Sequence, residues 1–259
     1  MNLMQVGRVA GAPNHGTGIG TRRVLDVVIA IIGLALLAPV MMLVCIAIWL
    51  DSGGPIFFSQ VRLGQSGKGF RIYKFRKFHR ESGATGCGVT IKDDRRMTRL
   101  GRFLTRTKLD ELPQLWNVIK GDMTIVGPRP ESAIFKDCVT CEYLSVLEHK
   151  PGIFGPNQCY FRNEGALYPE GADPERFYRE VLFPLKARID FAYFSHRTTW
   201  TDIGWVIRGL LAVCGVQSAA INPHAVLGGW LEPHNRYERA HRAESMNTGA
   251  CRTNGRTRE

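Results

Sequence analysis

Residues 22–51 read RRVLDVVIAIIGLALLAPVMMLVCIAIWLD, and from Val24 to Leu50 the only charged side chain is that of Asp26. This run is too long to be the apolar core of a cleaved signal peptide, and more apolar sequence follows the small residues where cleavage could occur. We therefore expect the segment to stay attached to the chain and to enter a membrane.

Pro39 interrupts this apolar run. A straight helix of 27 residues would be about 40 Å long, enough to cross a hydrocarbon core of roughly 30 Å. Proline lacks a backbone donor and its ring clashes with the carbonyl of the residue four positions earlier, here Ala35. The pieces on either side would be about 22 Å and 18 Å long, and neither crosses the core alone.

Basic residues flank the run on both sides, which bears on its topology. Positive charge near a membrane segment favours the cytoplasmic side. A re-entrant helix bent at Pro39 keeps both flanks on that side, whereas a proline-kinked transmembrane helix keeps only one. Arg22 and Arg23 precede the run, and those that follow it are Arg62, Lys68, Arg71, Lys74, Arg76, Lys77 and Arg80.

The sequence after residue 51 predicts an α+β, mainly helical domain. Residues 54–78, GPIFFSQVRLGQSGKGFRIYKFRKF, indicate two strands joined by a glycine-rich turn, which is a β-hairpin. Apolar residues recur at helical spacing over 112–119, before Gly121, and over 177–192. Residues 200–215, WTDIGWVIRGLLAVCG, form a further amphipathic run that suits either a core or a lipid interface.

The chain carries a net charge of +11, with 34 Lys and Arg against 23 Asp and Glu, which indicates an anionic partner. We expect no nucleic acid, because the sequence has no helix-turn-helix, zinc-finger or aromatic RNA-binding signature.

Asp110 and Glu111 stand side by side within this basic chain. Pro113 follows, and acidic residues suit a helix start, so a structural interpretation is available. Basic residues surround the pair, however, as they would in a site that holds phosphates and a metal ion. An aspartate can also attack phosphorus and form an acyl phosphate.

The sequence resembles the monotopic phosphoglycosyl transferases, a family of bacterial sugar transferases. The resemblance covers roughly residues 22–215. It rests on the hairpin sequence above and on DDRRMTRLGRFL (93–104), LDELPQLWNVIKGDMTIVGPRPE (109–131) and KPGIFGPNQ (150–158), taken together and in this order.

The family resemblance implies an activity and its location. It implies transfer of a sugar 1-phosphate from a nucleotide sugar, with uridine diphosphate as the expected nucleotide, to polyprenyl phosphate. Such a step starts the assembly of an exopolysaccharide, capsule, O-antigen or glycoconjugate. The expected place is the cytoplasmic face of the bacterial inner membrane, in contact with membrane lipid through a re-entrant helix.

The resemblance also implies residue roles. Asp110 matches the nucleophile and the expected contact to Mg²⁺, and Glu111 matches its acidic partner. Lys74, Arg76 and Arg129 match basic residues of the site.

The sequence departs from the family pattern at two places. Many members have arginine five residues before the nucleophile, where Thr105 stands here and Arg106 follows. Arg162 lies in a segment that differs from the usual one, and is either a phosphate ligand or an exposed arginine.

The predicted organisation has four parts: a disordered leader (1–21), a re-entrant membrane helix (22–51), a catalytic domain with interfacial amphipathic helices (52–216) and a largely disordered tail (217–259). The alternative to an enzyme is a catalytically silent membrane scaffold of a polysaccharide assembly system. The sequence specifies neither the sugar nor the oligomeric state, and a homo-oligomer is compatible with it.

Overall fold

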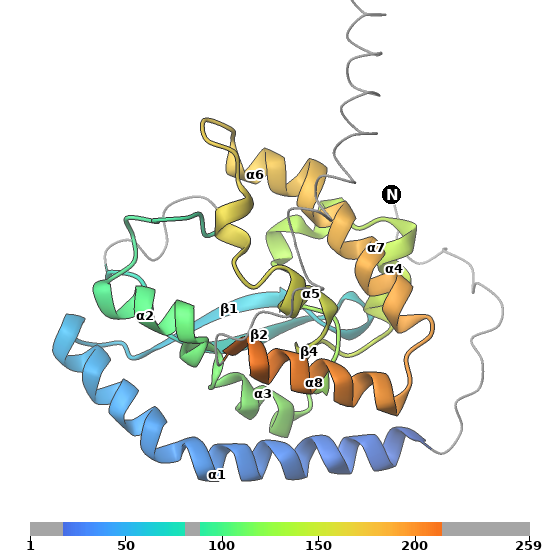
Figure 1. The fold of residues 1–259 in the computed structure, drawn as a ribbon, viewed down its shortest axis with the longest axis horizontal. Coiled ribbons are helices and arrows are strands. Elements are labelled where there is room, and N and C mark those ends of the chain that lie inside the picture. Colours follow the sequence, from blue (N-terminus) through green and yellow to red (C-terminus); the bar gives the residue numbers. More distant parts are fainter. Residues whose placement is uncertain (1–17, 81–88, 214–259) are drawn as a thin grey trace, which may run out of the picture.

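The structure is a computed structural model that describes residues 18–80 and 89–213. Residues 1–17 of the predicted leader and the whole predicted tail lie outside the described residues. Within them the fold is mainly helical, as the sequence predicts, and it has two small two-stranded sheets (Figure 1).

The apolar run forms one long helix, α1 (Gly18–Ser52), which begins four residues earlier than predicted. Pro39 lies inside this helix and does not divide it into two separate helices. Figure 1 shows that α1 bends along its length and follows the lower edge of the molecule. A proline inside a helix is a common cause of such a bend.

Both ends of α1 are attached to the rest of the fold. Near its start, Arg23 donates hydrogen bonds to the carbonyls of Val118 and Ile119 at 2.6 and 2.9 Å. Asp26, the charge inside the apolar run, accepts one from the Ile125 backbone N–H at 3.0 Å. Near its end, Ile48 is fully buried in a cluster that includes Phe75 and Leu104.

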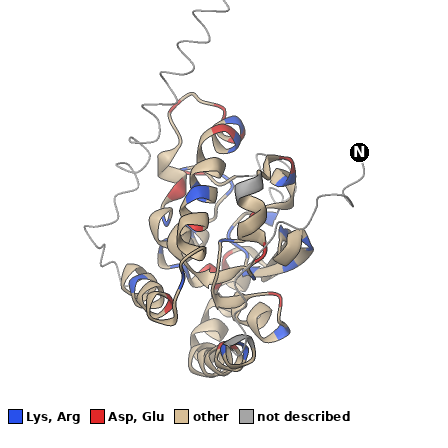
Figure 2. Cartoon of the chain, turned by 90° about the vertical axis from the view of Figure 1, so that its right-hand side faces the viewer, with Lys and Arg blue, Asp and Glu red and all other residues tan. Residues whose placement is uncertain are grey.

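The other face of α1 carries exposed apolar side chains, among them Leu36, Leu43 and Leu50. Figure 2 shows α1 nearly end-on at the bottom of the molecule, and its charged residues lie near its two ends, at Arg22, Arg23 and Asp26 and at Asp51. By length and composition it could cross a membrane, although one such helix is weak evidence.

The predicted hairpin is confirmed. Strand β1 (Phe57–Leu63) pairs antiparallel with β2 (Gly69–Phe75), and a short turn of 3₁₀ helix, η1 (Gln65–Gly67), lies between them. A second sheet was not predicted: β3 (Thr124–Val126) pairs in parallel with β4 (Gly152–Phe154).

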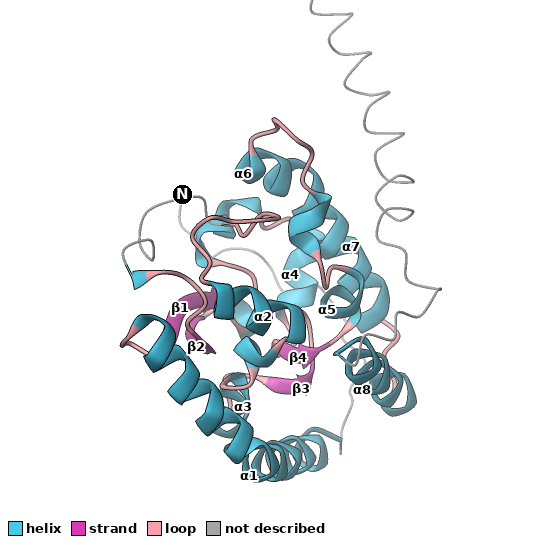
Figure 3. Ribbon diagram, turned by 60° about the vertical axis from the view of Figure 1, so that its left-hand side comes forward, coloured by secondary structure: helices cyan, strands magenta, loops and turns pink. Residues whose placement is uncertain are grey.

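Short helices make up most of the remaining domain (Figure 3). The helix predicted over 112–119 is α3 (Gln114–Lys120), and Gly121 ends it in the left-handed conformation, with a φ of 92°. The helix predicted over 177–192 begins with a π turn, η6 (Tyr178–Leu182), and continues as α7 (Phe183–Phe194). The others are α2 (Arg99–Thr107), η3 (Leu109–Glu111), η4 (Ala133–Cys138), α4 (Cys141–Leu147), α5 (Pro156–Tyr160), η5 (Glu164–Leu167) and α6 (Pro174–Phe177).

The last described helix, α8 (Thr199–Val213), matches the amphipathic run predicted over 200–215. It packs through Trp205 and Gly209 and leaves Ile203, Ile207 and Leu210 exposed. Figures 1 and 3 both show α1 and α8 along the lower side of the molecule.

Candidate active site

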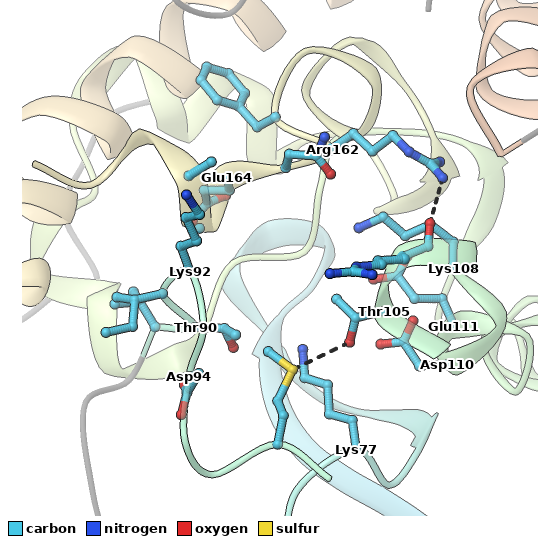
Figure 4. A pocket seen from close by; sticks show the side chains of 18 of the residues that line it. Lys77, Thr90, Lys92, Asp94, Thr105, Lys108, Asp110, Glu111, Arg162 and Glu164 are labelled. Atoms are coloured by element: carbon cyan, nitrogen blue, oxygen red, sulfur yellow. Dashed lines mark hydrogen bonds between the residues drawn. The ribbon is translucent and has the colours of Figure 1, made fainter. Parts of the chain in front are cut away.

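A cavity of about 630 Å³ lies above the hairpin, and its walls come from segments far apart in the sequence (Figure 4). Basic side chains dominate the lining: Arg62, Lys74, Lys77, Lys92, Arg102, Arg106, Lys108, Arg129, Arg162 and Lys186. The acidic ones are Asp93, Asp94, Asp110, Glu111, Glu131 and Glu164. A cavity of this size and charge suits a ligand with several phosphate groups.

A sharp reversal of the chain brings Asp110 into this cavity. Helix α2 ends at Thr107, and Lys108 adopts the left-handed conformation with a φ of 60°, which is uncommon for a residue other than glycine. The single turn η3 follows and carries both carboxylates. Asp110 is only 2% exposed, and its Oδ1 atom has no hydrogen-bond partner among the described residues. Because Asp110 also lines the cavity, this oxygen is free to contact a ligand there.

Neither carboxylate is explained by helix capping. The residue at the N-cap of α3 is Pro113, and no side chain accepts a hydrogen bond there. Glu111 instead contacts Lys74, whose Nζ donates to its Oε1 at 2.8 Å, and Arg129 lies 4.0 Å from the same oxygen. Neither carboxylate therefore caps α3 through a hydrogen bond, although both lie in the turn η3 directly before it.

The pKa values of the two neighbouring carboxyl groups are shifted in opposite directions. Burial raises the pKa of Asp110, and Glu111 raises it further, against the opposing effect of Lys77. Burial would also raise the pKa of Glu111, but Lys74, Lys108 and Arg129 outweigh it and hold that pKa well below its usual range. Glu111 thus stays ionised and keeps Lys74 in place, while Asp110 faces the cavity.

Arg129 enters the cavity from the loop after β3, between Pro128 and Pro130. Its backbone N–H hydrogen-bonds to the carboxyl group of Asp190, which is buried on α7. Burial raises the pKa of Asp190 to about 8. The arginine is therefore fixed both by its neighbouring prolines and by a buried contact to α7.

A buried polar network lies behind Arg129. The Lys186 ammonium is 2.7 Å from Glu164, 3.4 Å from Glu131 and 3.1 Å from the Tyr178 hydroxyl, and that hydroxyl also bonds to Glu131. Sequence reasoning missed all four residues. Glu131 ends the GPRPE motif and could have been singled out, whereas Tyr178 and Lys186 lie within an amphipathic helix pattern that gives no such signal.

The structure brings together five of the predicted site residues. Lys74, Asp110, Glu111, Arg129 and Arg162 all line the cavity. The Arg162 guanidinium donates to the Arg106 carbonyl at 2.8 Å, as the dashed line in Figure 4 shows.

Arg76 does not join them, and its prediction as a phosphate ligand requires correction. It is buried and donates to the carbonyls of Ser52, the last residue of α1, and of Gly53 and Gly54 just beyond it. Strand alternation would place Arg76 beside Lys74, but β2 ends at Phe75, so the alternation no longer applies. Arg76 instead fastens the end of α1 to the hairpin.

Mg²⁺ can be tested against the donors present. The described residues contain no group of three or more His, Cys, Asp or Glu that could hold a metal ion. Magnesium, however, is often held by one or two carboxylates together with substrate phosphates and water. The unpartnered Oδ1 of Asp110 fits such a site, in which the substrate supplies most of the ligands.

Comparison with known proteins gives a consistent result. The profile of the bacterial sugar transferase family matches residues 18–215. A UDP-glucose:undecaprenyl-phosphate glucose-1-phosphate transferase of Caulobacter vibrioides is 35% identical over 192 residues, which cover 72% of this chain and 67% of that protein. A UDP-N-acetylgalactosamine-undecaprenyl-phosphate N-acetylgalactosaminephosphotransferase of Aeromonas hydrophila is 35% identical over 185 residues, 70% of this chain and 41% of that one.

A third relative, a putative undecaprenyl-phosphate N-acetylgalactosaminyl 1-phosphate transferase of Bacillus subtilis, is 43% identical over 119 residues, 46% of this chain and 66% of that protein. The chain thus spans from about two fifths to two thirds of the length of these relatives. The match to the family profile covers α1, the hairpin, both carboxylates and every segment that lines the cavity. This chain belongs to the bacterial sugar transferase family.

Proposed function

We propose that this protein transfers a sugar 1-phosphate from a uridine diphosphate sugar to undecaprenyl phosphate, by way of a covalent intermediate on Asp110. The observation that carries the proposal is the buried, unpartnered oxygen of Asp110, which faces a cavity lined by cations. Relatives whose names specify this reaction support the choice of substrates.

The proposed reaction has two displacements. In the first, a carboxylate oxygen of Asp110 attacks the phosphorus that bears the sugar. An aspartyl O–P bond forms, the pyrophosphate P–O bond breaks, and uridine monophosphate leaves. In the second, a phosphate oxygen of undecaprenyl phosphate attacks the same phosphorus, and the aspartyl O–P bond breaks. The Asp110 carboxylate is then regenerated and no proton is gained or lost in the sum.

The surrounding residues have separate tasks in this proposal. Lys74 and Arg129 bind phosphate oxygens, and the ionised Glu111 keeps both cations oriented. Asp110 would hold Mg²⁺. A bound Mg²⁺ would neutralise part of the negative charge of the pyrophosphate. Glu111 holds Lys74 in place, and the neighbouring prolines restrict Arg129. Both cations therefore need little rearrangement when the substrate binds.

The test is release of uridine monophosphate by the purified full chain with Mg²⁺, undecaprenyl phosphate and each of a panel of uridine diphosphate sugars. We expect release with one or a few of the sugars and none after chelation of the metal. If no sugar gives release, the protein is a silent scaffold and not an enzyme, and the proposal is wrong.

We further propose that α1 is re-entrant and that the domain lies at the cytoplasmic face of the membrane. Contacts at Arg23 and Asp26 attach the start of α1 to the same domain that buries Ile48 near its end. A helix that crossed the bilayer would carry these two ends to opposite sides, where one domain of this size cannot reach both.

Cysteine labelling in intact cells tests this topology. With a membrane-impermeant maleimide, Gly20→Cys at the start of α1 and Lys68→Cys at the hairpin turn should both stay unlabelled until the cells are permeabilised. The unsubstituted protein, which has seven cysteines, gives the background. Labelling of Gly20→Cys alone in intact cells would show that α1 crosses the membrane.

A further inference from the structure

Lys77 is a cation of the cavity that the predicted set of site residues omits. It follows the end of β2 by two residues. Figure 4 shows its side chain rising into the cavity beside Thr105, on the side where Asp110 lies. Because Arg76 faces the end of α1, the basic residues that this segment supplies to the cavity are Lys74 and Lys77.

The backbone of Lys77 is held tightly against α2. Its carbonyl accepts a hydrogen bond from the Thr98 N–H at 3.0 Å. A Cβ atom on Gly101 would lie 2.0 Å from the same carbonyl oxygen, so only glycine permits this approach. Thr105 lies one turn further along α2 and donates to the Gly101 carbonyl at 2.9 Å. Lys77 and Thr105 therefore belong to one rigid part of the cavity wall.

The Lys77 ammonium has no carboxylate within 4 Å among the described residues, unlike Lys74 and Lys186. Its contact is the ring of Phe78, 5.3 Å from the ring centre. Burial, together with the charges of Lys74 and Lys108, lowers the pKa of Lys77 to about 8, against the pull of Asp110. Among the lysines around Asp110, Lys77 lowers the pKa of that carboxyl group most. The half-buried Lys77 ammonium, on the side of the cavity where Asp110 lies, is thus available to bind an anionic ligand.

We propose that Lys77 is a catalytic residue that binds the phosphoryl group while it is transferred to and from Asp110. The inference rests on the proposed function. A phosphorus within reach of Asp110 places its non-bridging oxygens near this ammonium, where charge is redistributed in the transition state. Glu111 balances part of the charge of Lys74 at 2.8 Å, whereas Lys77 adds a positive charge that no carboxylate within 4 Å balances among the described residues.

Arg106 is the rival cation on this wall. It also lines the cavity, but its side chain is exposed, and its described polar contact is that of its carbonyl with Arg162. An exposed guanidinium is screened by water, whereas Lys77 lies in the more enclosed part of the wall. We therefore assign the phosphoryl contact to Lys77.

The experiment measures release of uridine monophosphate in a single turnover, without lipid acceptor, for Lys77→Met, Lys77→Arg and Arg106→Met. Lys68→Met, an exposed lysine of the hairpin turn, is the matched control. Loss of one such donor typically costs about 10²-fold in rate. We expect that loss for Lys77→Met, with a smaller change in KM and an unchanged Tm, because methionine keeps the apolar stem. Lys77→Arg should stay within about tenfold of the wild type, and Lys68→Met should match it.

Three results would overturn the assignment. Release at the wild-type rate by Lys77→Met would show that Lys77 does not act, and would leave the proposed function intact. A Lys77→Arg variant as slow as Lys77→Met would show that charge is not what the position supplies. No release by the wild type would overturn the proposed function, and the role of Lys77 with it.

Discussion

Asp110→Asn should abolish the release of uridine monophosphate and the formation of lipid-linked sugar alike. Asparagine keeps the size of the side chain and one oxygen but is not an anionic nucleophile, so both displacements fail. Loss of one catalytic residue in a serine protease, another enzyme with a covalent intermediate, costs roughly 10⁴- to 10⁶-fold in rate, and we expect a loss of that order. The measurement is single-turnover release from a radiolabelled uridine diphosphate sugar.

The covalent step has a direct signature in the wild type. Enzyme and radiolabelled sugar nucleotide alone should give protein-bound sugar phosphate before any lipid acceptor is added. An acyl phosphate should be released by hydroxylamine, unlike a phosphoserine.

Glu111→Gln is the matched control for Asp110→Asn. It should be impaired through Lys74 and Arg129 but retain a trace of activity, because Glu111 forms no bond to phosphorus. Substantial lipid-linked product from Asp110→Asn would refute the covalent mechanism.

Gly152→Ala should both destabilise the protein and remove its activity. A Cβ atom on Gly152 would lie 2.0 Å from the Gly127 nitrogen and 2.5 Å from its Cα, and neither backbone atom can rotate away. Forcing such an atom into a packed core costs about 1–3 kcal/mol, and more when the backbone itself must move. Gly152 also donates to the Pro128 carbonyl at 2.9 Å, so the displaced loop is the one that carries Arg129.

Thermal unfolding in detergent and release of uridine monophosphate together check this expectation. Gly204→Ala is the control, because a Cβ atom on Gly204 of α8 would have no neighbour within 4 Å. Alanine suits a helix better than glycine, so that variant should keep or slightly raise Tm. A Gly152→Ala protein with the Tm and rate of the wild type would contradict the close approach of the two loops.

Secondary-structure elements that depend on residues close together in the sequence were predictable. The hairpin follows from strand-forming residues on both sides of a glycine-rich turn, and Gly121 ends α3 because the left-handed conformation suits glycine. Each of these signals lies within about 25 residues of sequence.

The β3–β4 pair was not predictable in this way. Three-residue strands are too short to show alternation, and their pairing joins Thr124 to Gly152 across a long stretch of chain. The motifs next to these strands, GPRPE directly after β3 and KPGI at the start of β4, therefore looked like separate features, although Gly127 and Gly152 lie against each other.

The sequence by itself determined the apolar helix, the proline within it, the hairpin and the acidic pair, because each depends on neighbouring residues and their spacing. Only the tertiary structure decided which basic residues face the acidic pair. It turned Arg76 toward the end of α1, brought Lys77 into the cavity and placed the Lys186 network behind Arg129. The physical reason is that a side chain's direction beyond the end of a strand depends on what the backbone packs against, here α2 and α1, and local sequence does not record that contact.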